Sequence, residues 1–227
     1  MGIDLNEIIP LGRSYTEYVR MFGLDEIGEP VSILDCGGGP SSFNSCMSRK
    51  GNFVVSIDPI YEFNKVDIEK RINETFNDII NQAGKNKDKF VWDSIGSVAE
   101  LEMMRRSSMD EFLSDFEKGK KNCRYISADV TGLPFKNNQF ELALSSHFLF
   151  LYESILSYGF HLNAITEMLR VADEARVFPL VDLNIDRCSY VDKIISKFEQ
   201  KNYLTSIVKV DYEFQKGGNQ YLKIMRA

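Results

Sequence analysis

The chain has 227 residues, 44% of them apolar and 26% charged, so it can bury a sizeable core, which excludes a disordered or collagen-like chain. It contains no run of 18 apolar residues, so we expect no membrane span. Asp and Glu outnumber Lys and Arg by 33 to 27, a net charge of −6. This balance argues against nucleic acid as a partner, because phosphates are neutralised by clustered Lys and Arg.

The cysteines give no sign of a metal or redox site. All four are scattered, without a Cys-x-x-Cys pair or a neighbouring His tract, so we expect no metal. The first ten residues, MGIDLNEIIP, carry two acids and no basic region before an apolar run, which argues against a secretory signal. We therefore expect reduced thiols, a cytoplasmic location and no membrane partner.

Strand and helix patterns alternate along the chain, which predicts an α/β fold with a mostly parallel sheet. A helix is predicted to begin at Ser14, because Ser14 and Glu17 have capping-box spacing and Tyr18 then faces inward. This helix belongs to an N-terminal helical cap over residues 1–24. Further along the chain, strands are predicted at 31–34, 53–57, 124–128, 140–145 and 176–183, and helices at 163–171 and 190–200.

The C-terminal part of the chain has the pattern of a hairpin. Residues 206–214 and 220–225 alternate apolar and polar side chains around Lys216-Gly217-Gly218-Asn219. The last strand should therefore run antiparallel to its neighbour. We interpret residues 1–227 as one domain, since no internal repeat divides them.

Residues 64–121 form a long insertion between the second and third predicted strands. A simple crossover needs about 10–12 residues, whereas this segment has 58, of which 23 are charged. Apolar residues such as Ile68, Ile72 and Phe76 recur at helical steps, which predicts amphipathic helices with solvated outer faces. The alternatives are an inert decoration and a lid over a substrate. We favour the lid, because long insertions near strand ends commonly serve binding.

A glycine turn follows the first strand. Asp35 closes that strand, and Gly37, Gly38 and Gly39 come directly after it. Glycines let the backbone turn tightly and let a ligand approach the main chain closely. Many α/β proteins have such a turn, so by itself it is a weak signal.

Two further acids follow the next two strands. Together with Asp35 they help to decide between a dinucleotide and a sulfonium cofactor as the ligand. Asp58 closes the second strand, where doubly wound folds bind ribose hydroxyls, and Asp129 follows the third. A dinucleotide would bring a pyrophosphate beside Asp35, and the third glycine of a GxGxxG motif is replaced by Ser42. A sulfonium cofactor carries a positive sulfur and an ammonium group, so it suits a cleft rimmed by acids.

These motifs resemble those of class I S-adenosylmethionine-dependent methyltransferases. The matching stretches are DCGGG at 35–39, Asp58, AD at 128–129 with LPF at 133–135, and FELAL at 140–144. The resemblance covers about residues 25–63 and 123–227. It implies a Rossmann-like, seven-stranded, mainly parallel sheet with a C-terminal antiparallel hairpin. Ser41 departs from the family pattern, because many relatives have a third glycine there.

The resemblance also implies roles for individual residues toward S-adenosyl-L-methionine. Gly37 and Gly39 would lie under the methionine part, and Asp35, Gly38 and Pro59 are placed in the same cofactor-binding set. Asp58 would bind the ribose hydroxyls, Asp129 and the amide of Val130 would bind adenine, and Ser145 and Ser146 would lie near the amino group of the cofactor.

His147 is the candidate catalytic residue, since it follows the fourth strand, at the edge where open α/β sheets bind ligands. With an ordinary pKa near 6.5 it could accept a proton from a hydroxyl or amine, and activity would then rise with pH through that value. The alternative is a histidine that serves packing. Arg13, Tyr15 and Tyr18 on the N-terminal cap are candidates for substrate binding. Because Arg holds carboxylates in bidentate fashion, Arg13 could pair with a carboxylate of the cofactor or of the substrate, and the alternative is a surface arginine at the start of a helix.

The function that follows from the resemblance is methyl transfer to an unidentified acceptor. A small-molecule substrate is expected, because the chain lacks the Asn/Asp-Pro-Pro-Tyr/Phe run of enzymes that methylate amino groups of nucleic acids, and also lacks a basic tail. A protein substrate stays open. The alternatives are a non-catalytic cofactor-binding or interaction protein on the same fold and a nicotinamide-dependent oxidoreductase.

Overall fold

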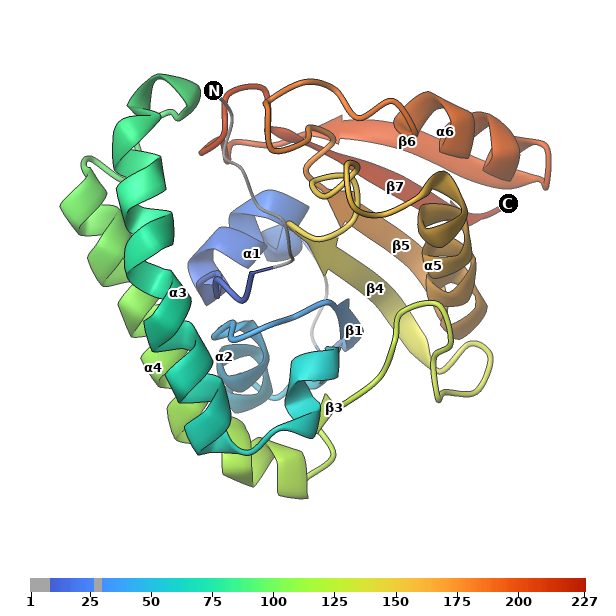
Figure 1. Cartoon of the computed structure of the whole chain (residues 1–227). Coiled ribbons are helices and arrows are strands. Elements are labelled where there is room, and N and C mark those ends of the chain that lie inside the picture. The colour runs from blue at the N-terminus through green and yellow to red at the C-terminus, as the bar shows by residue number, and fades with distance from the viewer. Residues whose placement is uncertain (1–8, 27–29) are drawn as a thin grey trace.

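The computed structural model describes residues 9–26 and 30–227, so residues 1–8 of the expected N-terminal cap lie outside the described residues. Within the described part, seven strands form one sheet in the order β3-β2-β1-β4-β5-β7-β6 (Figure 1). The strands are β1 Ser32–Cys36, β2 Phe53–Ile57, β3 Tyr125–Ile126, β4 Phe140–Ser146, β5 Ala172–Phe178, β6 Tyr203–Lys209 and β7 Gln220–Arg226.

The direction of the strands follows the prediction. β1 pairs in parallel with β2 and β4, β3 extends the sheet beside β2, and β5 extends it beside β4. β7 then inserts antiparallel between β5 and β6. The Rossmann-like, seven-stranded, mainly parallel sheet with a C-terminal antiparallel hairpin is therefore confirmed.

Helices cover both faces of the sheet, and each face has its own apolar cluster (Figure 1). Side chains of α1 to α4 pack on one face and those of α5 and α6 on the other. This is the layered arrangement in which a parallel sheet is buried on both sides. The helices are α1 Tyr15–Phe22, α2 Phe43–Arg49, α3 Lys65–Lys85, α4 Val98–Lys121, α5 Tyr158–Val171 and α6 Val191–Glu199.

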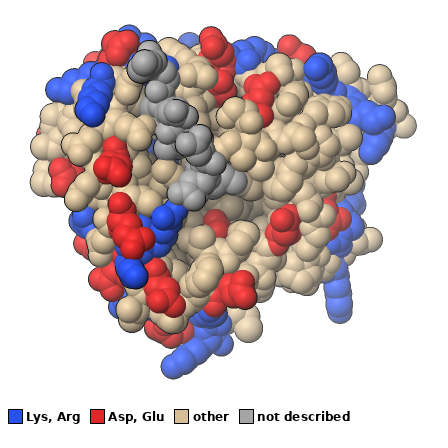
Figure 2. Space-filling view, in the orientation of Figure 1, with Lys and Arg blue, Asp and Glu red and all other residues tan. Residues whose placement is uncertain are grey.

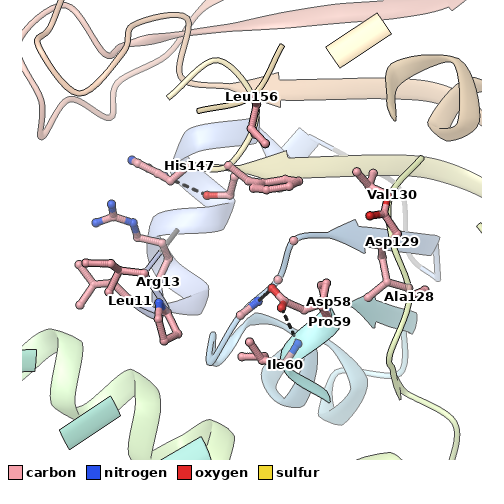
Figure 3. Close-up of a pocket in the computed structure, with 18 of the residues that line it drawn as sticks. Leu11, Arg13, Asp58, Pro59, Ile60, Ala128, Asp129, Val130, His147 and Leu156 are labelled. Carbon is pink, nitrogen blue, oxygen red and sulfur yellow. Dashed lines mark hydrogen bonds between the residues drawn. The ribbon is translucent and has the colours of Figure 1, made fainter. Parts of the chain in front are cut away.

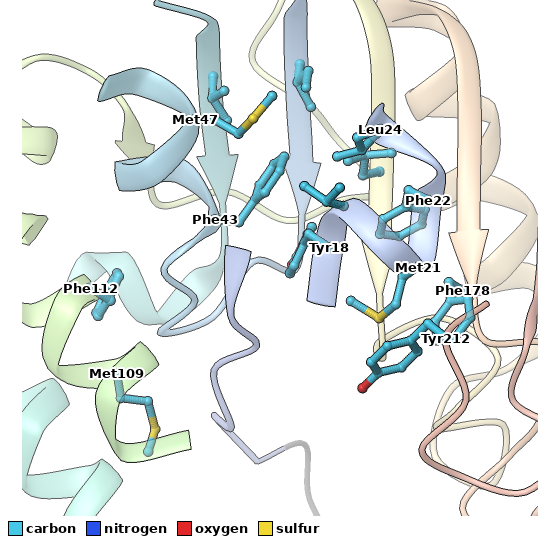
Figure 4. Close-up of a cluster of buried hydrophobic side chains, with 14 of the residues drawn as sticks. Tyr18, Met21, Phe22, Leu24, Phe43, Met47, Met109, Phe112, Phe178 and Tyr212 are labelled. Atoms are coloured by element: carbon cyan, nitrogen blue, oxygen red, sulfur yellow. The ribbon is translucent and has the colours of Figure 1, made fainter. Parts of the chain in front are cut away.

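α1 begins where the sequence predicts. The hydroxyl of Ser14 accepts from the amide of Glu17, and the Glu17 carboxylate accepts from the amide of Ser14, which completes the capping box. The helix is amphipathic and buries Tyr18 and Phe22 (Figure 4). The ring of Tyr18 stacks on Phe43 with centroids 4.3 Å apart, so α1 and α2 are packed directly against each other.

The insertion forms two long helices, α3 and α4, that run side by side along one edge of the molecule (Figure 1). One buried ion pair ties α4 to α1: Arg105 of α4 donates to both oxygens of Glu17 at 2.5 and 2.6 Å. The hydroxyl of Tyr212, in the loop between β6 and β7, donates to the same carboxylate at 2.7 Å. Three distant segments of the chain therefore meet at Glu17.

Several boundaries differ from the sequence prediction. β5 ends at Phe178 instead of continuing to residue 183, and β6 ends at Lys209 instead of continuing to residue 214. The second difference has a clear cause, because Tyr212 and Phe214 turn inward and are buried in the core. The carbonyl of Phe214 then accepts from the amide of Val91 at 2.7 Å, which joins the loop to the insertion.

Among residues 9–26 and 30–227, no helix has both the length and the apolar composition that crossing a membrane requires.

Candidate functional site

A cavity of about 320 Å³ lies at the carboxyl ends of four adjacent parallel strands. Its wall includes the segments that follow β1, β2, β3 and β4, together with part of the N-terminal segment. Figure 2 shows a hollow in the middle of this face, with acidic side chains beside it. A volume of this size is in the range of small-molecule sites, and the position is the usual one for ligands of open α/β sheets.

The turn after β1 needs glycine for two different reasons. Gly37 has φ +70°, a left-handed backbone conformation that residues other than glycine rarely adopt. A Cβ added at Gly38 would lie 2.3 Å from Oδ2 of Asp35 and 2.9 Å from the hydroxyl of Tyr61. The backbone of this turn, including Gly39, forms part of the cavity wall.

Asp35 lies beneath this turn, outside the cavity wall. Its carboxylate accepts from the hydroxyl of Tyr18 at 3.1 Å and from that of Ser56 at 2.8 Å, and the residue is 1% exposed. Burial raises the pKa of Asp35 to about 7, although the two hydrogen bonds favour the ionised form. The structure thus gives Asp35 the position of a support for the glycine turn.

Asp58 connects the segments that follow β1 and β2, and it faces the cavity (Figure 3). One carboxylate oxygen accepts from the amide of Gly39 and the other from the amide of Ile60, each at 3.0 Å. Burial raises the pKa of Asp58 to about 6, although these two hydrogen bonds favour the ionised form and lower it. Because a carboxylate offers about four acceptor positions, Asp58 retains capacity for a ligand hydroxyl. Pro59 lies beside it on the wall.

Asp129 and Val130 form the wall after β3, next to Asp58 (Figure 3). Oδ1 of Asp129 accepts from the amide and the hydroxyl of Thr131, at 2.7 and 2.6 Å. Among the described residues nothing donates to Oδ2, and the side chain is exposed. Asp129 therefore combines a turn-stabilising role with a free acceptor at the cavity.

The end of β4 brings Ser146 and His147 to the wall. Ser146 Oγ lies 3.0 Å from Nδ1 of His147 and 3.8 Å from the sulfur of Met21, to which its hydroxyl donates. Ser145 does not line the cavity, because neighbouring side chains on a strand point to opposite faces. Its hydroxyl is buried and has no hydrogen-bond partner in the described part of the chain.

The pKa of His147 differs from the sequence expectation. Burial, and then the positive charge of Arg13, lower the pKa of His147 well below its usual 6.5. The expectation that activity would rise through a pKa near 6.5 is thereby corrected. At neutral pH the imidazole is uncharged.

Arg13 lies opposite Asp58 (Figure 3), and its backbone is held firmly. Its carbonyl accepts from the hydroxyls of Ser41 and Ser108 at 2.8 and 2.7 Å, and from the amide of Ser42 at 3.2 Å. The side-chain Nε and Nη1 are buried, yet neither has a hydrogen-bond partner among residues 9–26 and 30–227.

The two candidate tyrosines of the cap point in different directions. Tyr18 reaches the wall of the cavity, where its hydroxyl bonds to Asp35. Tyr15 does not line the cavity: its ring packs against the core beside α2 and lies under the ammonium of Lys50 at 5.5 Å.

A second cavity, of about 90 Å³, adjoins the first and shares Ile9, Leu11, Arg13 and His147 with it. Its other walls come from α3, α4 and the segment between them, from the loops that follow β4 and β5, and from the loop between β6 and β7. The sequence offered no local signal for this cavity. The same is true of several apolar residues in the first wall, namely Ile9, Pro10, Leu11, Ile60, Leu156 and Phe160.

The comparison with solved structures identifies the fold. Magnesium protoporphyrin IX methyltransferase (ChlM) from Synechocystis PCC 6803 with bound SAM superposes with a TM-score of 0.50 at 10% identity, over 94% of this chain and 78% of that one. The same enzyme with bound SAH also gives 0.50, at 11% identity, over 93% and 82% of the two chains. The chain therefore has the fold of a methyltransferase, as the sequence motifs predicted.

Sequence comparison identifies the family. The chain is 36% identical over 225 residues to the uncharacterized protein MJ0045 from Methanocaldococcus jannaschii, and the match covers 99% of both chains. The chain belongs to the same family as MJ0045. A search of protein-family models gave no match.

Proposed function

We propose that the protein is an S-adenosylmethionine-dependent methyltransferase that acts on a small-molecule acceptor. The observation that carries this proposal is Asp58, which faces a 320 Å³ cavity between a glycine turn and Asp129 on a methyltransferase fold. Three acids at or beneath the wall suit a ligand that carries a sulfonium and an ammonium group.

The wall residues fit the parts of this cofactor in chain order. Gly37, Gly38 and Gly39 line the cavity and would present backbone to the methionine part, and the ring of Phe148 packs against Gly37. Asp58 would accept from the ribose hydroxyls with its remaining lone pairs. Asp129 would accept from the amino group of adenine, beside the backbone of Val130.

When bound, S-adenosylmethionine supplies a methyl group on a positively charged sulfur, which an acceptor lone pair can attack. The chain itself then needs to hold the two reactants in line and to exclude water. Such positioning is worth up to about 7–11 kcal/mol of the barrier. The apolar residues Leu11, Ile60 and Phe148 surround the cavity and limit the access of water.

His147 has one ring nitrogen beside Ser146 and one that makes no hydrogen bond to the described residues. Nδ1 lies 3.0 Å from Ser146 Oγ, and the tautomer of the ring decides which of the two donates. Because burial and Arg13 lower its pKa, the imidazole is uncharged at neutral pH and carries one unprotonated nitrogen. His147 is therefore the candidate base for an acceptor that carries a hydroxyl or amine.

A small acceptor is supported by the sizes of the cavities and by the surface. The two cavities measure about 320 and 90 Å³, which suits a cofactor with a compact second ligand. On the face shown in Figure 2, Lys and Arg are interspersed with Asp and Glu, which does not favour a nucleic-acid backbone.

Calorimetry with S-adenosylhomocysteine tests the proposal. Asp58→Ala should weaken binding by about 1.5–3 kcal/mol, the range for hydrogen bonds to a charged group. Asp173→Ala, an exposed acid on β5, serves as the matched control and should bind like the wild type. Binding by the wild type without turnover of any acceptor would favour the non-catalytic alternative, and binding of NADH alone would favour the oxidoreductase.

A further inference from the structure

The second cavity is an apolar chamber with few polar groups, and it opens at the place where a reaction would occur. Ile80, Phe90, Leu101 and Phe214 are among the side chains that line it. His147 and Arg13 belong to the walls of both cavities, so they mark the junction. A ligand in the chamber would therefore contact His147 and adjoin the proposed cofactor.

The chamber has an unbalanced positive charge. Two guanidinium groups, Arg13 and Arg105, line it, and Glu17 is the carboxylate beside them. Glu17 is occupied by two bonds from Arg105 and one from the hydroxyl of Tyr212. Arg13 has buried Nε and Nη1 atoms without a partner in the described residues, and Nε of Arg105 is in the same condition. Unpaired buried donors on a cation are costly, so this arrangement favours an anion.

The side chain of Arg13 extends toward the side where the methyl acceptor would bind. This is away from the residues proposed to hold the adenosine part of the cofactor. In Figure 3 its guanidinium lies on the side of the His147 ring, away from Asp58 and Asp129. A third polar group completes the pattern, because Oε1 of Gln215 is buried in the chamber region and lacks a donor among the described residues. The chamber thus offers cationic hydrogen-bond donors, apolar walls and one hydrogen-bond acceptor.

We propose that the methyl acceptor is a small carboxylate whose anionic group pairs with Arg13 at the junction and whose apolar part enters the second cavity. A hydroxyl or amino group of this molecule would donate to Gln215 or present its proton to His147. The chamber measures about 90 Å³, and a cavity of about 150 Å³ holds benzene. The part that enters is thus smaller than a benzene ring, as in a short branched aliphatic acid. The inference rests on the methyltransferase function proposed above.

Direct binding measurements test the charge preference. Calorimetry with the protein alone, and with the protein saturated with S-adenosylhomocysteine, would compare butyrate, isovalerate and 3-hydroxybutyrate with their uncharged amides. We expect at least one carboxylate to bind at least tenfold more tightly than its amide. In Arg13→Gln this preference should disappear, whereas Lys118→Gln, which removes an exposed charge on α4, should keep it.

A second measurement separates the acceptor from the cofactor as the partner of Arg13. Arg13→Gln should bind S-adenosylhomocysteine within threefold of the wild type. A larger loss that spares 5′-methylthioadenosine, which lacks the amino-acid carboxylate, would assign Arg13 to the cofactor and overturn the inference. Equal binding of acids and amides by the wild type, or a preference that persists in Arg13→Gln, would also overturn it. Absence of S-adenosylhomocysteine binding in the wild type would instead contradict the proposed function, while the comparison of acids with amides on the protein alone stays valid.

The unfolding temperature gives an independent readout. Because Arg13 is buried without a partner in the described residues, Arg13→Gln should unfold at a temperature equal to or above that of the wild type when no ligand is present. A lower unfolding temperature would mean that the guanidinium serves the structure, which contradicts a ligand role.

Discussion

The two adjoining cavities are built in different ways. The larger one is lined by the loops that directly follow four parallel strands, with further side chains from the N-terminal segment and from Leu156 and Phe160. The smaller one is made of side chains from the N-terminal segment, the insertion, the segments that follow β4 and β5, and the β6–β7 loop. Local motifs specify the strand-end part of the first cavity, whereas the second exists only after distant segments have packed together.

The two regions also depend on different interactions. At the larger cavity the turn conformation relies on glycines, on bonds from the amides of Gly37 and Gly38 to the carbonyl of Ile57, and on the bond from the amide of Gly39 to Asp58. At the smaller one, the three segments are tied together by the ion pair between Arg105 and Glu17 and by Tyr212. Substitutions can therefore damage one region and leave the other in place.

The largest expected effect is on catalysis, at the junction of the two regions. His147→Gln should lower the rate of methyl transfer to a hydroxyl or amine by about 10²–10⁴-fold, the usual contribution of a general base. Affinity for S-adenosylhomocysteine should stay unchanged. Because the pKa of His147 is lowered, wild-type activity should be flat between about pH 6.5 and 8 and fall only in more acidic buffer. A loss below tenfold would assign His147 to packing.

The next effect is on stability and belongs to the smaller cavity. Arg105→Met leaves Glu17 as a buried unpaired charge and should lower the free energy of unfolding in urea by about 3–5 kcal/mol. The double variant Glu17→Gln/Arg105→Met should recover part of this loss. Lys118→Met, on an exposed position of the same helix, should change stability little. A small effect of Arg105→Met would mean that the three segments are held by apolar packing alone.

A smaller effect is expected in the glycine turn. Gly38→Ala places a methyl group against Asp35 and Tyr61 and should cost about 1–3 kcal/mol of unfolding free energy, as overpacking does. Gly132→Ala is the matched control, since an added Cβ there meets nothing within 4 Å. Equal stability of the two variants in urea would show that the turn can rearrange.

The last expected effect is a change in how steeply the free energy of unfolding varies with pH. The folded pKa of Asp35, about 7, lies above its unfolded value, so the native state binds the proton more tightly between about pH 4 and 7. Stability from this group is present below pH 4 and is lost as the pH rises through 7, by at most about 1.4 kcal/mol per pH unit. Asp35→Asn should flatten that fall in urea unfolding measured from pH 5 to 8. A slope identical to the wild type would mean that Asp35 is ionised throughout.

The contrast between the regions explains what the sequence could predict. The end of β2, the position of Asp58 and the glycine turn were readable because each depends on neighbours within a few residues. The distinction between Ser145 and Ser146 was not readable, because a shift of one residue decides which side of the sheet a side chain faces. The same applies to Tyr15 and Tyr18 on a helix, where three residues of spacing do not decide which one reaches the cavity.

Other features depended on tertiary packing. The alternation in residues 206–214 predicted a longer strand, but burial of Tyr212 and Phe214 ends β6 at Lys209. The lowered pKa of His147 arises from burial and from Arg13, which lies far away in sequence. No local pattern carries that information.

The hydrogen bond between Tyr212 and Glu17 joins residues 195 positions apart. During synthesis the chain emerges from its N-terminus, so the strands β1 to β4 and the glycine turn can assemble while the C-terminal hairpin is still inside the ribosome. The hydrogen bonds that join Glu17 to Arg105 and Tyr212 are therefore complete only after the last tenth of the chain has been made. We therefore expect newly made chains to form the larger cavity first and the smaller cavity last, so that a truncated or stalled product would expose the apolar faces of α3 and α4 to other proteins.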